Sequence, residues 1–127
     1  MSTRTTLTDA KAEKATAWLS ATITDDDGVT PLADADEELD TLTMLLYESR
    51  AGTLINMTSA RDVLNANGAT VSSDGALLVR LDPADMVMLS TSSQEVHIAL
   101  FEWMWGNPAK YGKHEVAFPV KNLVKVT

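Results

Sequence analysis

The feature that most constrains the fold is an apolar run, QEVHIALFEWMW, over residues 94–105. Read with the two-residue period of a strand, one side carries Val96, Ile98, Leu100 and Met104, and the other carries His97, Ala99, Phe101, Trp103 and Trp105. A strand that is apolar on both sides is covered on both, or is covered on one side and docked to a partner on the other. We expect Leu100 to face the core.

A second alternating segment follows this run and predicts a hairpin. The break GNPAKYG over 106–112 has the composition of a turn. The sequence HEVAFPVKNLVKV alternates again, so residues 94–105 and 113–126 predict two long antiparallel legs. Pro119 removes a backbone donor in the middle of the second leg. We therefore expect this leg to lie at a sheet edge or to carry a bulge.

Short alternating segments separated by turn residues precede the hairpin. They predict strands at 15–24, 39–48, 53–56, 69–73 and 76–81. One or two helical turns are predicted at 58–64 and a single turn after Asp82, with an acidic linker over 25–38. With about seven short strands and little helix, the chain predicts an all-β, antiparallel sandwich that buries Leu46 in its core.

Composition limits the class of protein. At 127 residues the chain is long enough to be one domain with its own core. With no cysteine it has no disulfide, thiolate zinc site or cysteine nucleophile. A net charge of -8 argues against nucleic acid as a partner, because phosphate binding requires clustered lysine and arginine. No apolar run reaches the roughly 18 residues of a membrane span, and the polar N-terminus predicts no signal peptide. We expect synthesis in the cytoplasm and no membrane partner.

Residues 1–14 are polar, rich in threonine and poor in large apolar side chains. They predict a flexible or extended N-terminal arm, followed by a sandwich domain over 15–127. A segment of this kind orders on a partner surface and raises its own effective concentration there. We expect its removal to leave the stability of the sandwich nearly unchanged and to weaken binding to the partner.

No pattern in the sequence is specific for catalysis. His97 and His114 lie on the two legs of the hairpin and are candidates for cross-strand neighbours, but neither has the second histidine two positions away that a strand metal site favours. The acidic residues of 25–40 lack the spacing of an EF-hand loop. A solvated linker is the default for them, with a calcium site and a contact to a basic partner as alternatives. The sequence has no nucleophile elbow and no phosphate loop. We predict no enzyme, no metal and no cofactor.

Several segments carry a resemblance to a known family. They are ATITDDDGVTPL at 21–32, LTMLLYESRAGTLIN at 42–56, ARDVLNANGATVSSDGALLVRLDPAD at 60–85, EVHIALFEWMWGNPAKYGKHEV at 95–116 and VKNLVKV at 120–126. The run LLVRLDPAD at 77–85 resembles the corner between the fifth and sixth strands of immunoglobulin-like sandwiches, without their cysteine pair or corner tyrosine. Over about residues 15–126 the chain is similar to small immunoglobulin-like structural proteins of tailed bacteriophage virions.

The resemblance implies a virion protein that acts by binding other virion proteins. Its partners would be major capsid, neck or tail subunits, and the chain would be repeated in the particle as a homo-oligomer. Head decoration (cement) or head–tail joining is the first expectation. A tail or host-adhesion module that binds a receptor or sugar is the alternative, and an unrecognised enzyme is the third hypothesis.

Five residues are the candidates for contact with such a partner. Arginine and tryptophan are favoured at protein interfaces, and large apolar side chains supply buried area there. For Trp103 and Trp105, packing in the core is the alternative interpretation. The candidates are Arg4, Leu7, Trp18, Trp103 and Trp105.

Overall fold

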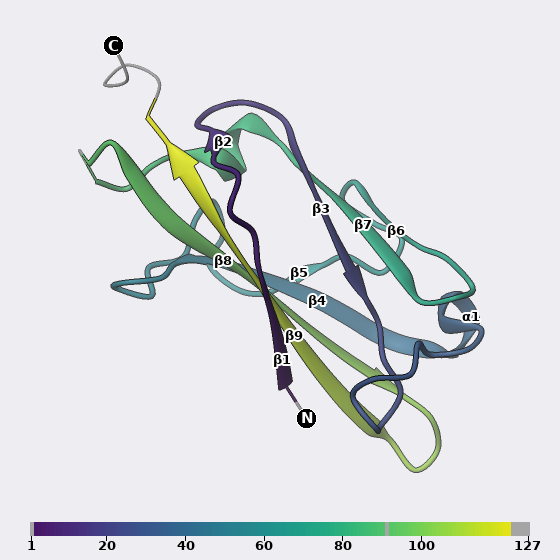
Figure 1. Cartoon of the computed structure of the whole chain (residues 1–127). Helices are drawn as coiled ribbons and strands as arrows, with labels where there is room; N and C mark the ends of the chain where they lie inside the picture. The colour runs from purple at the N-terminus through teal and green to yellow at the C-terminus, as the bar shows by residue number, and fades with distance from the viewer. Residues whose placement is uncertain (1, 91, 123–127) are drawn as a thin grey trace.

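The computed structural model describes residues 2–90 and 92–122 and shows a sandwich of two β-sheets (Figure 1). The larger sheet has the strand order β1-β9-β8-β4-β5, with β2 also paired to β9, and the smaller sheet has the order β3-β7-β6. The strands are β1 (Ser2–Thr6), β2 (Lys11–Ala12), β3 (Ala17–Thr22), β4 (Leu39–Glu48), β5 (Arg61–Asp62), β6 (Ala69–Val71), β7 (Ala76–Leu81), β8 (Gln94–Trp105) and β9 (Lys110–Lys121). Two helical elements, α1 (Ala35–Glu38) and the 3-10 turn η1 (Pro83–Met86), connect them.

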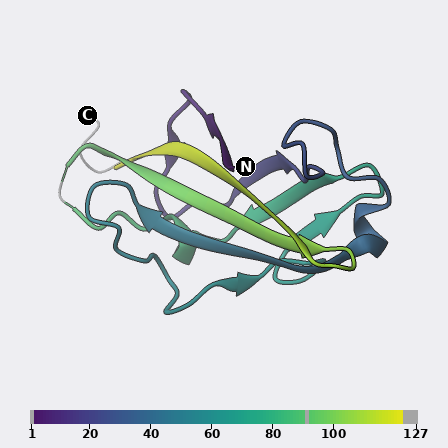
Figure 2. The ribbon, with the colours of Figure 1, turned by 90° about the horizontal axis from the view of Figure 1, so that it is seen from below.

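The topology is that of an immunoglobulin-like sandwich. In such a domain the second, fourth and fifth strands share one sheet, and the third, sixth and seventh share the other. Here β3, β6 and β7 form the smaller sheet, while β4, β8 and β9 form the middle of the larger one, in two layers (Figure 2). The predicted all-β sandwich is therefore confirmed. Its pairings are antiparallel except those of β1 and β2, which run parallel to β9.

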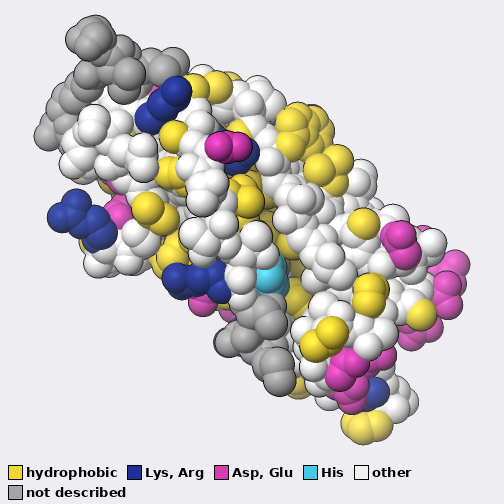
Figure 3. All heavy atoms as spheres, viewed as in Figure 1, with side chains coloured by type: hydrophobic (Ala, Val, Ile, Leu, Met, Phe, Trp, Pro, Cys, Tyr) yellow, Lys and Arg dark blue, Asp and Glu magenta, His cyan; other side chains and the backbone are white. Residues whose placement is uncertain are grey.

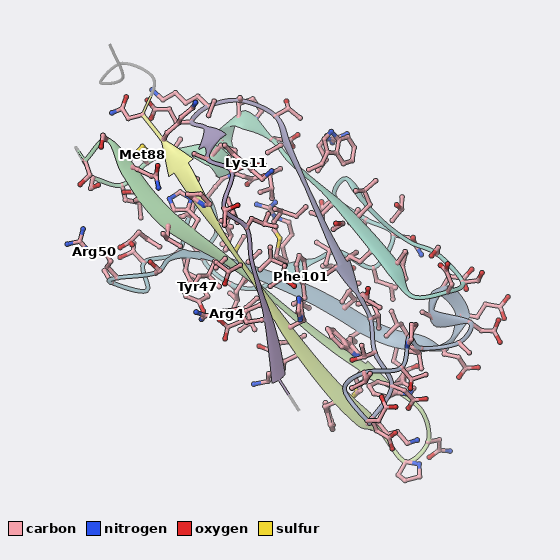
Figure 4. All side chains as sticks on the ribbon, viewed as in Figure 1. Arg4, Lys11, Tyr47, Arg50, Met88 and Phe101 are labelled. Carbon is pink, nitrogen blue, oxygen red and sulfur yellow. The ribbon has the colours of Figure 1, made fainter. Side chains whose placement is uncertain are left out.

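The β8–β9 hairpin fills the core with its aromatic face. The two strands pair in an unbroken register along the whole of β8, as the sequence predicts. Phe101, Trp103 and Trp105 are buried, and Phe101 points into the space between the two sheets (Figure 4). The predicted inward position of Leu100 is wrong, because the aromatic face of β8 is the one that packs on the smaller sheet. Leu46 is fully buried, as predicted.

Pro119 lies in an internal strand, so the predicted edge position of the last strand is wrong. β9 has β8 on one side and β1 with β2 on the other, and its register with β8 shows no bulge. The parallel pairing on the N-terminal side stops at Ala117 and resumes at Val120. Pro119 lies in this interruption, where its missing N–H removes no ladder bond. The predicted continuation of the strand over 123–126 lies outside the described residues.

The N-terminal segment takes part in the larger sheet. Beyond the pairing of β1 and β2, the N–H of Leu7 donates to the carbonyl of Ala117 at 2.8 Å, and that of Glu13 donates to the carbonyl of Lys121 at 3.0 Å. The side chain of Leu7 packs against the core. The described part of residues 1–14 is thus extended and paired within the sandwich (Figure 1). The structure predicts that its removal lowers stability, in contrast to the expectation from sequence.

The chain between β4 and β6 differs from the predicted strand at 53–56 and the predicted helix at 58–64. Leu54 forms only an isolated bridge with Tyr47, and Arg61–Asp62 form β5 against β4. Asn56 adopts a left-handed backbone conformation, which interrupts a regular strand. The helical spacing of 58–64 is overridden because Arg61 is held by a carboxylate of η1, as described below.

The other predicted elements are present. The strands expected at 15–24, 39–48, 69–73 and 76–81 are β3, β4, β6 and β7. The helical turn expected after Asp82 is η1, and it begins with a capping box in which the side chains of Asp82 and Asp85 each accept the other's backbone N–H. The acidic segment 25–38, expected as a linker, contains α1, and its Pro31 forms a bridge with Thr24.

Candidate binding surfaces

The two histidines do not form a site together. The register of the hairpin places His97 opposite Phe118, well separated from His114, so the predicted alternative of cross-strand neighbours is wrong. His97 is fully buried, with its Nε2 2.7 Å from Oε1 of Glu95 and its ring edge-on to Phe118 at 5.9 Å. His114 is half-buried, its Nε2 lies 2.8 Å from Oγ1 of Thr5, and burial lowers its pKa. Both rings therefore have structural partners.

The acidic segment 25–40 carries the entire net charge of the chain. It holds eight of the 18 acidic residues and none of the 10 basic residues, so the ten acidic and ten basic residues outside it cancel. Acidic side chains gather at one end of the sandwich, while lysine and arginine lie mostly toward the other (Figure 3). A hydrogen bond from the Thr30 side chain lowers the pKa of Asp27. Within residues 2–90 and 92–122, no group of three or more carboxylates and imidazoles is placed to hold a metal ion.

A pocket of about 480 Å³ is lined by two buried carboxylates, Glu48 and Glu95. Paired carboxylates in a cavity are a common arrangement in acid–base catalysis. Here each carboxylate accepts backbone hydrogen bonds instead. The donors are the N–H groups of Arg50 and Ala51 to Glu48, at 2.8 and 3.1 Å, and those of Leu89 and Ser90 to Glu95, at 2.7 and 3.1 Å. Burial raises the pKa of Glu95, but the hydrogen bonds from His97, Leu89 and Ser90 outweigh burial and leave that pKa lowered. Both carboxylates act as loop anchors.

The side of the larger sheet that faces away from the core carries a cluster of apolar residues on β4, β8 and β9, next to the charged residues Glu102, Lys113 and Glu115. Cross-strand partners lie on the same side of a sheet, and the register places Tyr47, Ile98 and Ala117 in one row. Ile98 is buried under its neighbours, whereas Val96 is 38% exposed. We call this surface the outer face and define it by Leu45, Tyr47, Val96, Ile98, Leu100, Ala117 and Pro119.

The smaller sheet has a mixed solvent side. A sandwich strand normally alternates an inward apolar residue with an outward polar one. The solvent side of the smaller sheet carries exposed Ser20, Thr22 and Thr70 and also two exposed apolar side chains, Trp18 and Leu78. The outer face of the larger sheet does not follow this rule. On the outer face Val96 is exposed and Leu45, Tyr47 and Leu100 are half-buried, and an apolar surface open to solvent is typical of a site of protein contact.

Charged pairs border the outer face. Arg4 of β1 forms an ion pair with Glu115 of β9, and Nζ of Lys113 lies 3.9 Å from Oε2 of Glu102. Tyr47 and Arg4 lie close together on this side of the molecule (Figure 4). Burial, followed by the negative charge of Glu115, raises the pKa of Tyr47. An apolar centre within a polar rim is the usual anatomy of a protein interface.

The five predicted contact residues divide between core and surface. Trp103 and Trp105 are only 2% and 4% exposed, so these two side chains belong to the interior, which corrects their assignment as partner contacts. Leu7 is half-buried and packs against the core. Trp18 is 52% exposed on the solvent side of the smaller sheet, and Arg4 is exposed at the rim of the outer face.

Sequence reasoning missed a buried polar network at η1. Asp85 is 1% exposed, and its carboxylate accepts hydrogen bonds from Arg61 at 2.7 and 3.2 Å, from Asn56 at 2.9 Å and from the N–H of Asp82 at 3.0 Å. Burial raises the pKa of Asp85, but these hydrogen bonds together outweigh burial and lower it. The capping box is a local signal for the bond to Asp82. The bond to Arg61, 24 residues away, has no local signal.

The fold and its surfaces define the class of this protein as an immunoglobulin-like β-sandwich with an apolar outer face. In the described chain, no helix has the length and apolar character needed to cross a membrane.

Comparison with known proteins does not narrow this class. No family model and no curated protein matches the sequence. Among solved structures, the chain is similar to MtrC from Shewanella baltica OS185, at 15% sequence identity and a TM-score of 0.47. The match covers 89% of this chain and 22% of that chain, so this chain spans less than a quarter of the length of MtrC. At this TM-score, the similarity bears on neither mechanism nor partners.

Proposed function

We propose that this chain is a structural protein of a tailed-bacteriophage virion that acts by protein–protein binding, as a head-decoration or head–tail joining module. The observation that carries the binding role is the outer face, an apolar surface with a charged rim on a sheet that has no third layer above it in the described chain. An immunoglobulin-like fold serves many functions, so the fold alone does not select this one. The virion setting rests on the sequence segments between 21 and 126 that resemble phage proteins of this fold.

The outer face suits a flat neighbouring subunit. Val96 and Leu100 present branched apolar side chains on either side of the buried Ile98, where burial against a partner is favourable. The pairs Arg4–Glu115 and Glu102–Lys113 at the rim carry both signs of charge. Charges of this kind contribute to the orientation and specificity of a partner more than to its affinity. In the particle the chain is repeated on an equivalent set of subunits, so its copies form a symmetric assembly.

Labelling of intact particles tests the virion setting. Purified particles produced from the genome that encodes this chain are imaged with an antibody raised against the purified protein. Label over the head supports decoration, and label at the neck supports joining. Particles that carry no label, from cells in which the protein is abundant, would refute the proposal.

Matched variants test the role of the outer face. Leu100→Glu introduces a charge among the apolar residues of this face, and we expect it to abolish incorporation into particles. Thr70→Glu introduces the same charge on the exposed side of the smaller sheet and should incorporate like the parent. Circular dichroism of both purified variants checks that each remains folded. Equal incorporation of the two variants would exclude the outer face as the contact.

A second function, a tail or host-adhesion module, is favoured by one observation. Trp18 is 52% exposed and pairs across strands with Arg80 on the solvent side of the smaller sheet. An exposed indole beside a cation is a platform on which a sugar ring or receptor side chain can stack. If this function holds, Trp18→Ala abolishes adsorption of the purified protein to host cells, and antibody labels the tail. Unchanged adsorption of Trp18→Ala would exclude it.

A further inference from the structure

The edge of the smaller sheet at β3 has backbone groups that point away from the fold. The N–H of Ile23 donates to the carbonyl of Gly75, on the side of β3 that pairs with β7. The N–H of Arg80, in β7, donates to the carbonyl of Gly68, the residue before β6. Because backbone groups alternate in direction along a strand, the N–H and C=O groups of Trp18, Ser20 and Thr22 point away from β7. β3 is the terminal strand of its sheet, and no described strand pairs with this side.

A groove of about 540 Å³ runs beside this edge. Ser20, Ala21 and Thr22 of β3, with Ala76 and Leu77 of β7, line one side, and Thr5 of β1 with His114 of β9 lines the other. Oγ1 of Thr5 and Nε2 of His114 lie 2.8 Å apart. Apolar side chains are visible in the hollow between β1 and β3 (Figure 3). The groove therefore combines an open sheet edge with a wall of small and hydroxyl-bearing side chains.

The space beside β3 has room for a single added strand. β3 packs over β9, and β1 extends the larger sheet one strand beyond β9. The position beside β3 in the smaller sheet thus lies over β1, and neighbouring strands are about 4.8 Å apart. A second copy of this domain that approached edge to edge, β3 against β3, would meet β1 before its own β3 reached hydrogen-bonding distance. A single extended segment meets no such obstacle.

Charge at the two ends of β3 sets the polarity of that segment. Asp25, Asp26 and Asp27 follow the C-terminal end of β3, within the segment that carries the whole net charge of -8. Lys14 is exposed before its N-terminal end. In an antiparallel pairing the N-terminal part of the added strand lies beside the aspartates, so it should carry lysine or arginine. Its groove-facing side chains should be small or β-branched, to match the wall.

We propose that the groove beside β3 accepts one extended segment of a partner protein, with a basic N-terminal end, which pairs antiparallel with β3 through backbone hydrogen bonds to Trp18, Ser20 and Thr22. Addition of a strand to an open sheet edge is a common mode of peptide recognition. This inference rests on the proposed function only in taking the segment from a virion partner. The test below uses purified protein, so its failure and a failure to label particles are separate results.

The probe is a capped synthetic peptide, KRTVSVTA, added to the purified full chain at up to about 1 mM. Hydrogen exchange followed by NMR should show the amides of Ser20 and Thr22 slowed about tenfold or more at saturation. Two further peptides have the same side chains but carry N-methyl groups on alternate backbone amides. One is methylated at the odd-numbered positions and the other at the even-numbered positions. We expect one of these peptides to bind and the other not, because one set of amides faces β3. Absence of binding by KRTVSVTA, or equal binding by both methylated peptides, would overturn the proposal.

Variants of the chain locate the contact. Ser20→Pro removes an N–H that points to the open edge, a position where a sheet tolerates proline, and it should abolish peptide binding. Ser20→Ala keeps the N–H and should bind like the parent. If Ser20→Pro does not fold, the methylated peptides with the parent chain still decide the result.

The peptide TVSVTAKR, with its basic residues at the other end, should bind more weakly at low salt, and equal binding would overturn the assigned polarity. Self-association of the parent chain that Ser20→Pro removes would instead make a second copy the occupant and overturn the assignment to a partner segment.

Discussion

The network around Asp85 gives the sharpest test of the structure. Its carboxylate is buried, with a side-chain exposure of 2%, and Arg61, which binds it with two hydrogen bonds, has a side-chain exposure of 18%. Asp85→Asn keeps the size of the side chain and removes its charge. The guanidinium of Arg61 is then left without its counter-charge, and Asn56 and the N–H of Asp82 lose a charged acceptor. Removing one partner of a buried pair costs about 3–5 kcal/mol, so we expect a loss of that size.

Urea unfolding followed by circular dichroism measures this loss. The midpoint should fall with an unchanged slope, because the surface exposed on unfolding stays the same. The control is a double-mutant cycle with Arg61→Met, in which the double variant should be more stable than the sum of the single changes by about 1–3 kcal/mol. If Asp85→Asn unfolds within about 0.5 kcal/mol of the parent, as surface substitutions do, the network does not support the fold.

The same network predicts a dependence on pH. Its hydrogen bonds hold the pKa of Asp85 in the folded chain below the ordinary value for an aspartate. A carboxyl group with a lowered folded-state pKa contributes stability above its unfolded-state pKa, and this contribution is lost as the pH falls through the folded-state pKa. The stability of the parent should therefore decline as the pH falls below about 4, while Asp85→Asn lacks this part of the decline. Parallel pH profiles for the two proteins would contradict the assigned shift.

Three further predictions follow from packing and pairing. Deletion of residues 1–14 should lower the unfolding midpoint in urea, since β1 and β2 pair with β9; an unchanged midpoint would restore the view of this segment as a loose arm. Leu46→Ala should cost about 2–5 kcal/mol as an unfilled core cavity, and Leu100→Ala, half-buried on the outer face, should cost clearly less in the same assay. Gly112→Ala places a Cβ against the indole of Trp103, closer than van der Waals contact allows, so we expect a loss of about 1–3 kcal/mol and a shift in tryptophan fluorescence; parent-like fluorescence and stability would contradict that close approach.

Local sequence patterns predicted the elements of this fold well. Alternation of apolar and polar residues marks a strand wherever one face is buried, and this signal located β4 with its bounds and its inward residue Leu46. Asp82 followed by Pro83 predicted the turn η1, because both residues act on the adjacent backbone. These signals work from sequence because each depends only on residues close together in the chain.

The candidate surfaces were less accessible to sequence reasoning. β8 is apolar on both faces, so its pattern does not say which face packs on the smaller sheet and which becomes the outer face. The sequence likewise identified both Trp18 and Trp103 as contact candidates, although only Trp18 is exposed. Burial depends on what packs above a residue, and residue type alone does not supply that information.

The sequence by itself determined the all-β class, the long hairpin and the acidic segment that holds the net charge. Only the tertiary structure decided that residues 2–6 pair with β9, that Pro119 lies in an interruption of this pairing, and that Arg61 turns toward Asp85. Each of these contacts joins segments far apart in the chain. Such contacts leave no periodic or capping signal in either segment, because the free energy that selects them arises only when the two segments meet in the folded molecule.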